Sequence, residues 1–558
     1  MLALHQIVKT VLHRAAIQEP PLGVLLMPQQ RRIHRGATTD PAPHPAGRDP
    51  RQRGCLRAAA EPGGRLLARN ALYNVLGQGL PLLVGLAAIP VTIRSLGEAR
   101  FGLLGLAWAI LGYVGVLDLG LGRATTKFVA EYLAVGDAEG LRRVATLSVA
   151  SQTLMGVLGG ALFAVLGPLL AGSVLGVPPA LRGEARGMLL ALALSVPLVV
   201  FSASLRALLE AAQRFDLVNL IRTPTSAAVL AVPAVAASLG ADLPVIVLLL
   251  LLVRLAACWV TAAFIPRAIP GFRWTLDPRW ETLRPLLGYG GWVSVSNVVS
   301  PLLTYLERFL LASLAGVAAV AYYTAPYEAV TRLLIVPAGL AGALFPALSA
   351  SGAAADGAAR DERLLGRPLR FLLLGLAPPV IVLIACAGLL IGAWLGPTYA
   401  ARSTTAFAIL ALGVLINGLA HLPYAYLLGR GRPDLPAKFH LLELPLYVVG
   451  GWVLIRQSGI NGAALAWTLR VTADAALLAV AVWRVAGVPP TRLLGNRGGR
   501  AAAAVAALAA AAAAGIALAP NAAARAVLLT GVVAAFAVAV WRFVLNDVER
   551  AGLRRVLA

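Results

Sequence analysis

Charged residues are scarce in this sequence. Asp, Glu, Lys and Arg make up 13% of the 558 residues, whereas they make up about a quarter of an ordinary soluble domain. Apolar residues account for 59%, and the mean hydropathy is +0.80. This composition excludes an ordinary soluble globular protein and predicts an all-α polytopic membrane protein.

Lysine and cysteine are also few. Lysine occurs only at positions 9, 127 and 438, so nearly all of the net charge of +23 comes from arginine. In a soluble protein such a charge would suggest a nucleic-acid partner, but here we expect it at the membrane surface and expect no nucleic acid. Cys55, Cys258 and Cys386 have no metal-ligand spacing and are interpreted as small hydrophobic residues.

Enzyme and cofactor motifs are missing. The sequence has no H-E-x-x-H, P-loop or C-x-x-C motif, and Gly120-Leu121-Gly122 has no preceding strand that would make it a dinucleotide site. We therefore expect no catalytic residue, no metal and no cofactor.

The first 64 residues differ from the rest of the chain. They hold several arginines and the segment Pro41-Ala42-Pro43-His44-Pro45. No apolar run there reaches the ~20 residues that cross a bilayer, and none resembles a signal peptide with a cleavage site. We expect residues 1–64 to be a disordered, basic, cytoplasmic tail, or an over-extended translation start.

From Arg69 onward, apolar segments alternate with short charged loops. Their lengths predict about fourteen transmembrane helices, with weakly marked turns at 239–242 and 520–521. The predicted helices are 70–93, 99–121, 144–171, 187–210, 217–239, 243–265, 285–312, 318–348, 369–394, 403–428, 437–455, 460–483, 501–519 and 524–544.

Loop charge predicts the orientation. If the N-terminus is cytoplasmic, alternate loops on the inner side hold about three times as many Lys and Arg residues as the outer loops. Both termini are therefore expected in the cytoplasm, with short outer loops and no inserted soluble domain. A weak repeat of Tyr73-Asn74-Val75 at Ser296-Asn297-Val298 favours two six-helix lobes and a trailing helix pair.

One stretch, 116–131, changes from an apolar helix end to a charged amphipathic helix. It places Asp118, Arg123 and Lys127 where a membrane-length helix leaves the hydrocarbon. Such a cluster suits a hydrated opening that receives anions, although residue type alone favours the simpler interpretation that these residues only mark the cytoplasmic side.

Several charged residues fall inside the predicted spans. A charge at mid-bilayer costs about 2.5–3.5 kcal/mol, so each needs a partner or a wet cavity. The candidates are Arg254, Glu307, Arg308, Glu328, Arg332, Arg470, Asp474 and, as a titratable group, His421. Glu328 with Arg332 and Arg470 with Asp474 are four apart and could simply pair on their own helices. Arg254 has no acid at that spacing.

A polar stripe follows the first predicted helix. Asn70, Asn74 and Gln78 are four residues apart, and such amides are unfavourable against lipid. They either bond to neighbouring helices or line a cavity.

Ordered motifs along the chain resemble those of the polysaccharide (O-antigen-type) flippases of the multidrug/oligosaccharidyl-lipid/polysaccharide exporter superfamily. They cover about residues 69–486 in register. The matching stretches are Leu96-Gly97-Glu98-Ala99-Arg100-Phe101-Gly102, Leu117-Asp118-Leu119-Gly120-Leu121-Gly122, Glu307-Arg308-Phe309-Leu310-Leu311, Leu344-Phe345-Pro346-Ala347-Leu348-Ser349, Leu428-Gly429-Arg430-Gly431-Arg432 and Gly459-Ile460-Asn461-Gly462-Ala463-Ala464.

The resemblance implies two lobes, 65–275 and 276–486, around a central cavity, followed by two extra helices in 487–558. The implied cargo is an undecaprenyl-diphosphate-linked oligosaccharide, moved to the outer leaflet of the inner membrane by alternating access. Membrane lipid, a polysaccharide polymerase and other assembly proteins are the implied partners.

Chemistry and resemblance together assign candidate roles to the polar residues. Arginine offers a forked donor that stays charged and suits a diphosphate. The expected phosphate-binding residues are Arg123, Lys127, Arg254, Arg308 and Arg332. The expected sugar-binding residues are Asn70, Asn74, Gln78 and Asn297, and the counter-charges or ion-coupling groups are Asp118, Glu307, Glu328 and Asp474.

Other functions stay open from the sequence. A lipid II flippase of the same superfamily also fits fourteen helices, whereas the buried arginines disfavour a cationic-drug exporter. A membrane polymerase or ligase would need a large basic, His-containing outer loop, and the outer loops here are short. A scaffold would leave the buried charges unexplained.

Overall fold

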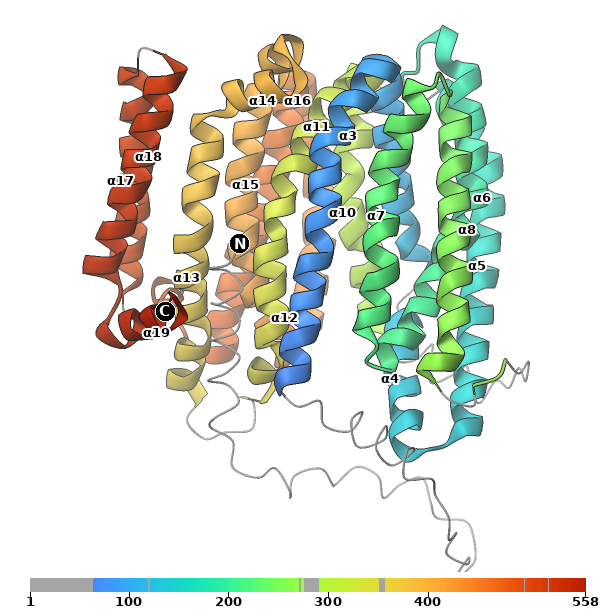
Figure 1. The fold of residues 1–558 in the computed structure, drawn as a ribbon, viewed down its shortest axis with the longest axis horizontal. Coiled ribbons are helices and arrows are strands. Elements are labelled where there is room, and N and C mark those ends of the chain that lie inside the picture. The colour runs from blue at the N-terminus through green and yellow to red at the C-terminus, as the bar shows by residue number, and fades with distance from the viewer. Residues whose placement is uncertain are drawn as a thin grey trace, which may run out of the picture.

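The computed structural model shows a bundle of long helices standing side by side (Figure 1). It describes residues 64–118, 121–173, 175–269, 272–274, 291–350, 357–495, 497–519 and 521–557. The predicted tail thus lies outside the described residues, apart from Gly64. Within the described ranges every regular element is helical, which confirms the all-α prediction.

The first group of helices runs from α3 to α8. It comprises α3 (Gly64–Tyr113), η2 (Val114–Asp118), α4 (Leu121–Val135), α5 (Ala138–Ser173), η3 (Pro179–Leu181), α6 (Arg182–Ala211), α7 (Phe215–Ser238) and α8 (Leu243–Ala268). Within this group α3 packs on α7, α5 on α6, and α8 on both α6 and α7. The predicted turn at 239–242 is confirmed, and Asp242 caps α8 by accepting a hydrogen bond from the Val245 amide at 3.2 Å.

The second group runs from α10 to α16. It comprises α10 (Gly291–Ala315), α11 (Val317–Thr331), η4 (Arg332–Leu334), α12 (Ile335–Ala350), α13 (Gly357–Ala385), α14 (Ala387–Leu395), α15 (Pro397–Gly429) and α16 (Asp434–Ala486). Helix α15 packs on α11, α12, α13, α14 and α16, and α10 packs on α16.

The last elements form a helix pair at one edge of the bundle (Figure 1). They are η6 (Pro490–Arg492), α17 (Gly498–Leu518), α18 (Ala522–Ala539), the π-helix η7 (Val540–Val544) and α19 (Asp547–Leu557). Helix α17 packs on α13 and α18. Asn521 caps α18 through a hydrogen bond from the Ala524 amide at 2.8 Å, which confirms the predicted turn there.

Two continuous helices each contain a sharp change of direction at a glycine. Gly97 in α3 has a φ of 75° and Gly459 in α16 has a φ of 53°. These backbone conformations favour glycine because it has no Cβ. Each break divides one long helix into the two segments predicted from the sequence.

Ten described helices are long and apolar enough to cross a membrane. One of them, Asp434–Ala486, contains two predicted spans because it turns at Gly459. The predicted total of fourteen therefore stays a prediction, whereas a multi-pass membrane protein is confirmed.

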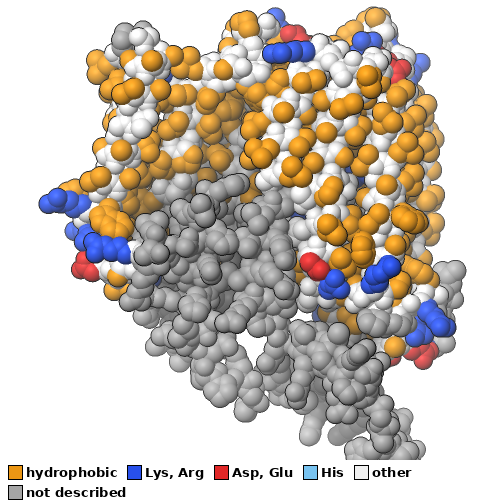
Figure 2. Space-filling view, in the orientation of Figure 1, with side chains coloured by type: hydrophobic (Ala, Val, Ile, Leu, Met, Phe, Trp, Pro, Cys, Tyr) orange, Lys and Arg blue, Asp and Glu red, His pale blue; other side chains and the backbone are white. Residues whose placement is uncertain are grey.

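The outer surface agrees with a lipid environment. On α5, Leu154, Leu158, Leu162 and Leu169 follow one helical face, and each is about 60% exposed. Over the coloured part of the visible face, hydrophobic side chains predominate, while charged ones gather toward its upper and lower edges (Figure 2). Such a belt would be unfavourable in water and is the surface that hydrocarbon requires.

The two groups of helices meet along α3, which contacts α10, α11, α12 and α14. After Gly97, its second half packs closely against α11 and α10. The contact depends on glycine, because a Cβ at Gly102 would lie 1.7 Å from the Val317 carbonyl oxygen, and one at Gly105 would lie 2.9 Å from Thr324 Oγ1. A Cβ at Gly112 would meet the Tyr305 ring at 2.4 Å. Small residues thus let the backbones approach closely. We call this contact the α3–α11 seam.

Candidate functional site

A cluster of buried charges lies between α10, α11 and η4. Arg308 on α10 is only 1% exposed, which would be costly for an unpaired cation. Its Nη2 donates to Glu328 Oε1 on α11 at 3.0 Å, and Arg332 Nη2 donates to Glu328 Oε2 at 3.2 Å. One carboxylate therefore holds two guanidinium groups, and we call these three residues the arginine triad.

Aromatic rings surround Arg308. Its guanidinium carbon lies 4.8 Å from the centre of the Tyr327 ring and 5.5 Å from that of Tyr305. Both distances are in the range of cation–π attraction, which strengthens when water is excluded. Arg308 Nε and Nη1 are buried and have no hydrogen-bond partner among the described residues. Arg308 is therefore fixed in place but retains unused donors.

Glu307 turns away from its neighbour Arg308. Its carboxylate accepts hydrogen bonds from Tyr323 at 3.3 Å and from Tyr447 on α16 at 2.8 Å. Adjacent residues on a helix point about 100° apart, so Glu307 and Arg308 need not pair with one another. Tyr447 extends the network into α16.

A second charged cluster lies where the two arms of α16 face each other. Arg470 Nη1 lies 3.6 Å from Glu443 Oε2, and the Arg470 guanidinium lies 5.6 Å from the Tyr447 ring centre. Asp474, one turn beyond Arg470, interacts electrostatically with it. Two acids thus share one arginine, and we call Glu443, Arg470 and Asp474 the acidic triad. The prediction of an Arg470–Asp474 pair omitted Glu443.

The signal for Glu443 was present in the sequence. It is an acid within an apolar segment, the criterion that selected the other candidates. His440, one turn earlier, is also buried, and its Nδ1 has no hydrogen-bond partner among the described residues. The tyrosines were not recognisable, because their hydroxyl groups become partners of Glu307 only through helix packing.

The remaining predicted cations lie in the first group of helices. Lys127 on α4 pairs with Glu131 at 3.9 Å, and both side chains are exposed. Arg254 on α8 is partly buried and makes no hydrogen bond or ion pair with any described residue. The structure thus joins Arg308 and Arg332 through Glu328, whereas Lys127 and Arg254 lie on other elements.

The other predicted residues lie on described helices, but their side chains are outside the described part of the chain. These residues are Asn70, Asn74, Gln78, Asp118, Arg123 and Asn297. His421 on α15 lies with Nδ1 2.8 Å from the Asn417 carbonyl oxygen, so a partner on its own helix satisfies that nitrogen.

The arrangement can therefore do two things chemically. The arginine triad offers guanidinium donors beside a half-exposed edge, since Arg332 and Glu328 keep 34% and 22% of their side-chain surface. The acidic triad carries one more carboxylate than cation and could take up a proton or a small cation. Among the described residues, no group of His, Cys, Asp and Glu has the arrangement of a metal site.

Comparison with known proteins supports the fold. A family described as "Polysaccharide biosynthesis protein" matches residues 67–351. A Shigella flexneri protein named "Putative O-antigen transporter" is 27% identical over 414 residues, which are 74% of this chain and 96% of that protein.

Solved transporter structures share the architecture at low sequence identity. The lipid II flippase MurJ in an inward closed conformation has a TM-score of 0.65 at 12% identity, covering 85% of this chain and 98% of that chain. An inward-facing multidrug-resistance MATE transporter of the MOP superfamily has a TM-score of 0.60 at 16% identity, covering 76% and 98%. These likenesses confirm the predicted transporter fold.

Proposed function

Because the chain belongs to the polysaccharide biosynthesis protein family, we propose that it moves a polyprenyl-diphosphate-linked oligosaccharide from the cytoplasmic to the outer leaflet. The similarity to a protein named as an O-antigen transporter supports this cargo. The protein acts as a transporter rather than as an enzyme, with lobes at 65–275 and 276–486 that rock against each other.

The arginine triad is the observation that carries the proposal. A diphosphate offers several acceptor oxygens. A guanidinium group can bind two of them at once through a pair of parallel N–H donors. Glu328 occupies the acceptor position at both Arg308 and Arg332. An arriving diphosphate would replace Glu328 at the partly exposed Arg332, while the buried Arg308 keeps the carboxylate in place. Arg254, which has no described acid partner, would provide a further cation, as would Arg123 and Lys127.

The polar residues predicted for the sugar complete this cargo assignment. Asn70, Asn74 and Gln78 lie on the first half of α3, and Asn297 lies on α10. Amide groups suit sugar hydroxyls because they both donate and accept hydrogen bonds. The polyprenyl tail would stay in lipid.

We assign the protein to the inner membrane, with both termini in the cytoplasm. The Arg-rich alternate loops support this orientation. The polymerase and other assembly proteins that use the exported glycan would then act on the outer side.

Export in a deletion strain tests the proposal. Cells that lack the gene should accumulate lipid-linked repeat units on the inner leaflet and lose surface glycan. Arg332→Gln should lower export about 10- to 100-fold, because a charge-assisted hydrogen bond contributes about 1.5–3 kcal/mol. Arg254→Ala should act in the same direction.

The control is Arg456→Gln, at an exposed arginine that stacks on Trp452 at 4.3 Å near the turn of α16. It removes the same charge away from the triad and should export normally. Full export by Arg332→Gln and Arg254→Ala at normal expression, or unchanged surface glycan in the deletion strain, would contradict the proposal. Accumulation of peptidoglycan precursor instead would identify a lipid II flippase.

A further inference from the structure

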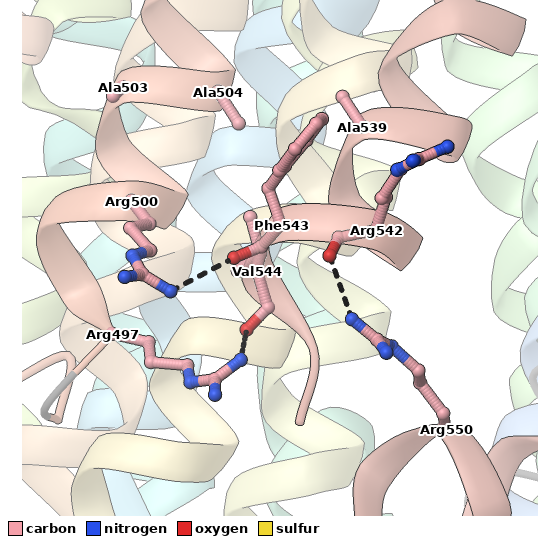
Figure 3. A pocket seen from close by; sticks show the side chains of 9 residues that line it. All are labelled: Arg497, Arg500, Ala503, Ala504, Ala539, Arg542, Phe543, Val544 and Arg550. Carbon is pink, nitrogen blue, oxygen red and sulfur yellow. Dashed lines mark hydrogen bonds between the residues drawn. The ribbon is translucent and has the colours of Figure 1, made fainter. Parts of the chain in front are cut away.

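A pocket of about 680 Å³ opens among the last helices, away from both charged clusters. Its walls come from the start of α17, the end of α18, η7 and α19 (Figure 3). Four arginines line it, Arg497, Arg500, Arg542 and Arg550. The volume is in the range of small-molecule sites.

The charged side chains that line this pocket are all positive. None of its nine lining residues is acidic. Asp547, which lies 3.1 Å from Arg550, is 97% exposed and is outside the lining. The first backbone amides of α17 add partial positive charge beside Arg497 and Arg500. The pocket therefore favours an anion.

Backbone carbonyl groups orient three of the four guanidiniums. Arg497 donates to the Val544 carbonyl at 3.1 Å, Arg500 to that of Phe543 at 3.5 Å, and Arg550 to that of Arg542 at 2.7 Å (Figure 3). All three acceptors lie in the π-helix η7, a rare conformation that frequently occurs at functional sites. Each guanidinium has five N–H donors, so these bonds hold the groups without using them up.

Arg542 supplies the free cation. Its side chain is exposed and has no hydrogen-bond or ion-pair partner in the described part of the chain. Next to it, Phe543 is 62% exposed and Val538 is 65% exposed. Apolar and cationic surface therefore adjoin at the pocket.

The position of the pocket along α17 and α18 indicates that a membrane lipid can reach it. Both Gly498–Leu518 and Ala522–Val544 have the length and hydropathy of membrane spans, and the pocket lies at the end where the first begins and the second finishes. The arginines thus lie at a hydrocarbon boundary, where basic pockets between transmembrane helices bind anionic headgroups.

We propose that this pocket binds the phosphate of an anionic membrane lipid, with the acyl chains against Phe543 and Val538. The site anchors the α17–α18 pair to the lipid around it. The inference depends on membrane insertion and not on which cargo the protein transports.

Lipid binding to the full-length protein tests the site. The purified protein, in neutral phosphatidylcholine nanodiscs, would be titrated with phosphatidylglycerol, and bound lipid would be counted by native mass spectrometry. Arg500→Gln/Arg542→Gln should weaken binding by roughly tenfold or more, because each arginine near an anionic surface contributes about 1 kcal/mol. These positions are chosen because both arginines are exposed.

The matched control is Arg267→Gln/Arg484→Gln. It removes two exposed arginines at the ends of α8 and α16, outside the pocket lining. Wild-type binding by this control together with weaker binding by the pocket variant supports the site. Equal binding by the pocket variant and the wild type overturns it, as does equal weakening in both variants.

Two further arms identify the source of the phosphate. Undecaprenyl diphosphate and inorganic phosphate would each be titrated in neutral nanodiscs. Binding of phosphatidylglycerol or undecaprenyl diphosphate that depends on Arg500 and Arg542 supports a lipid-phosphate site and says which lipid occupies it. Saturation by inorganic phosphate alone, with no lipid binding, overturns the assignment to lipid.

Discussion

Arg308 shows how this chain keeps a cation inside an apolar bundle. A carboxylate neutralises it at 3.0 Å, two tyrosine rings flank it, and almost no solvent reaches it. The flat guanidinium suits both tasks, because it stacks on aromatic faces and donates in its own plane. An ammonium group offers no such plane.

Replacement of Arg308 should therefore destabilise the protein. Arg308→Gln leaves Glu328 with Arg332 alone, and we expect a loss of about 2–3 kcal/mol, below the ~3–5 kcal/mol for a fully broken buried pair. Arg308→Lys should recover only part of this loss. Thermal unfolding in detergent measures both variants against Arg456→Lys, which changes an exposed stacked arginine. Wild-type stability of Arg308→Gln would contradict the account.

The acidic triad leads to a prediction about ion coupling. Glu443 and Asp474 face one arginine, so one carboxylate lacks a counter-charge and suits a proton or a cation. Glu443→Gln, which keeps the shape but removes the charge, should make export independent of the ion gradient and slow it. Export would be measured in vesicles with and without an imposed proton or sodium gradient.

A matched change at an exposed acid is the control for that experiment. Glu131→Gln removes a carboxylate that pairs with Lys127 at 3.9 Å on the surface of α4. It should leave the gradient dependence intact. A Glu443→Gln protein that still responds to the gradient as the wild type does would rule the triad out as a coupling site.

Single residues were predictable where the interaction is local. The spacing of Glu328 and Arg332 on one helix predicted their pair, which the structure contains at 3.2 Å. The pairing of Arg470 with Glu443 is not local in sequence. It forms because α16 turns back at Gly459 and brings its two arms together. The role of Tyr447 as a hydrogen-bond donor to Glu307 comes from packing between α10 and α16, which no local pattern encodes.

At the scale of elements, apolar segments predict where helices lie, but they do not predict where a helix is broken. The sequence predicts one helix over 318–348, but η4 interrupts it at Arg332–Leu334. The segment 369–394 divides into α13 and α14 around Cys386. Hydropathy is insensitive to such breaks because the side chains on both sides are apolar.

The α3–α11 seam gives a prediction at this scale. Gly102→Ala places a Cβ against the Val317 backbone, which cannot yield as a flexible side chain could. Overpacking typically costs about 1–3 kcal/mol, so the helices should separate there more often. The reactivity of Thr324→Cys, buried in this structure, toward an impermeant thiol reagent should rise.

Gly375→Ala on α13 is the control for the seam. A Cβ there meets no atom within 4 Å, so this variant changes helix propensity without crowding a neighbour. It should leave Thr324→Cys protected. Equal thiol reactivity in the Gly102→Ala and Gly375→Ala proteins would show that the seam does not open.

For the whole molecule, the proposed alternating access leads us to expect that the two groups of helices part at the seam. A Cβ at Gly105 would lie 3.3 Å from Thr324 Cβ, close to the ~3.5–4.5 Å of a disulfide. Gly105→Cys/Thr324→Cys, with Cys55→Ala, Cys258→Ala and Cys386→Ala, should therefore cross-link on oxidation. Export should stop when the bond forms and return on reduction.

The single variants Gly105→Cys and Thr324→Cys, in the same background, are the controls and should export equally under both conditions. Continued export by the oxidised double variant, with the cross-link verified by mass, would exclude rocking at this seam. It would leave the fold assignment intact, because that depends on the comparison with solved transporters.

The close glycine contacts of α3 also affect whether protons and ions can leak through the protein when no cargo is bound. Where backbones touch through small residues, no chain of water fits between them, so the seam itself offers protons and ions no path. Separating these surfaces exposes apolar area to water, which costs a free energy of about 25 cal/mol per Å². An empty protein should thus rest shut at this end, and a bulky cargo must supply the free energy that opens it.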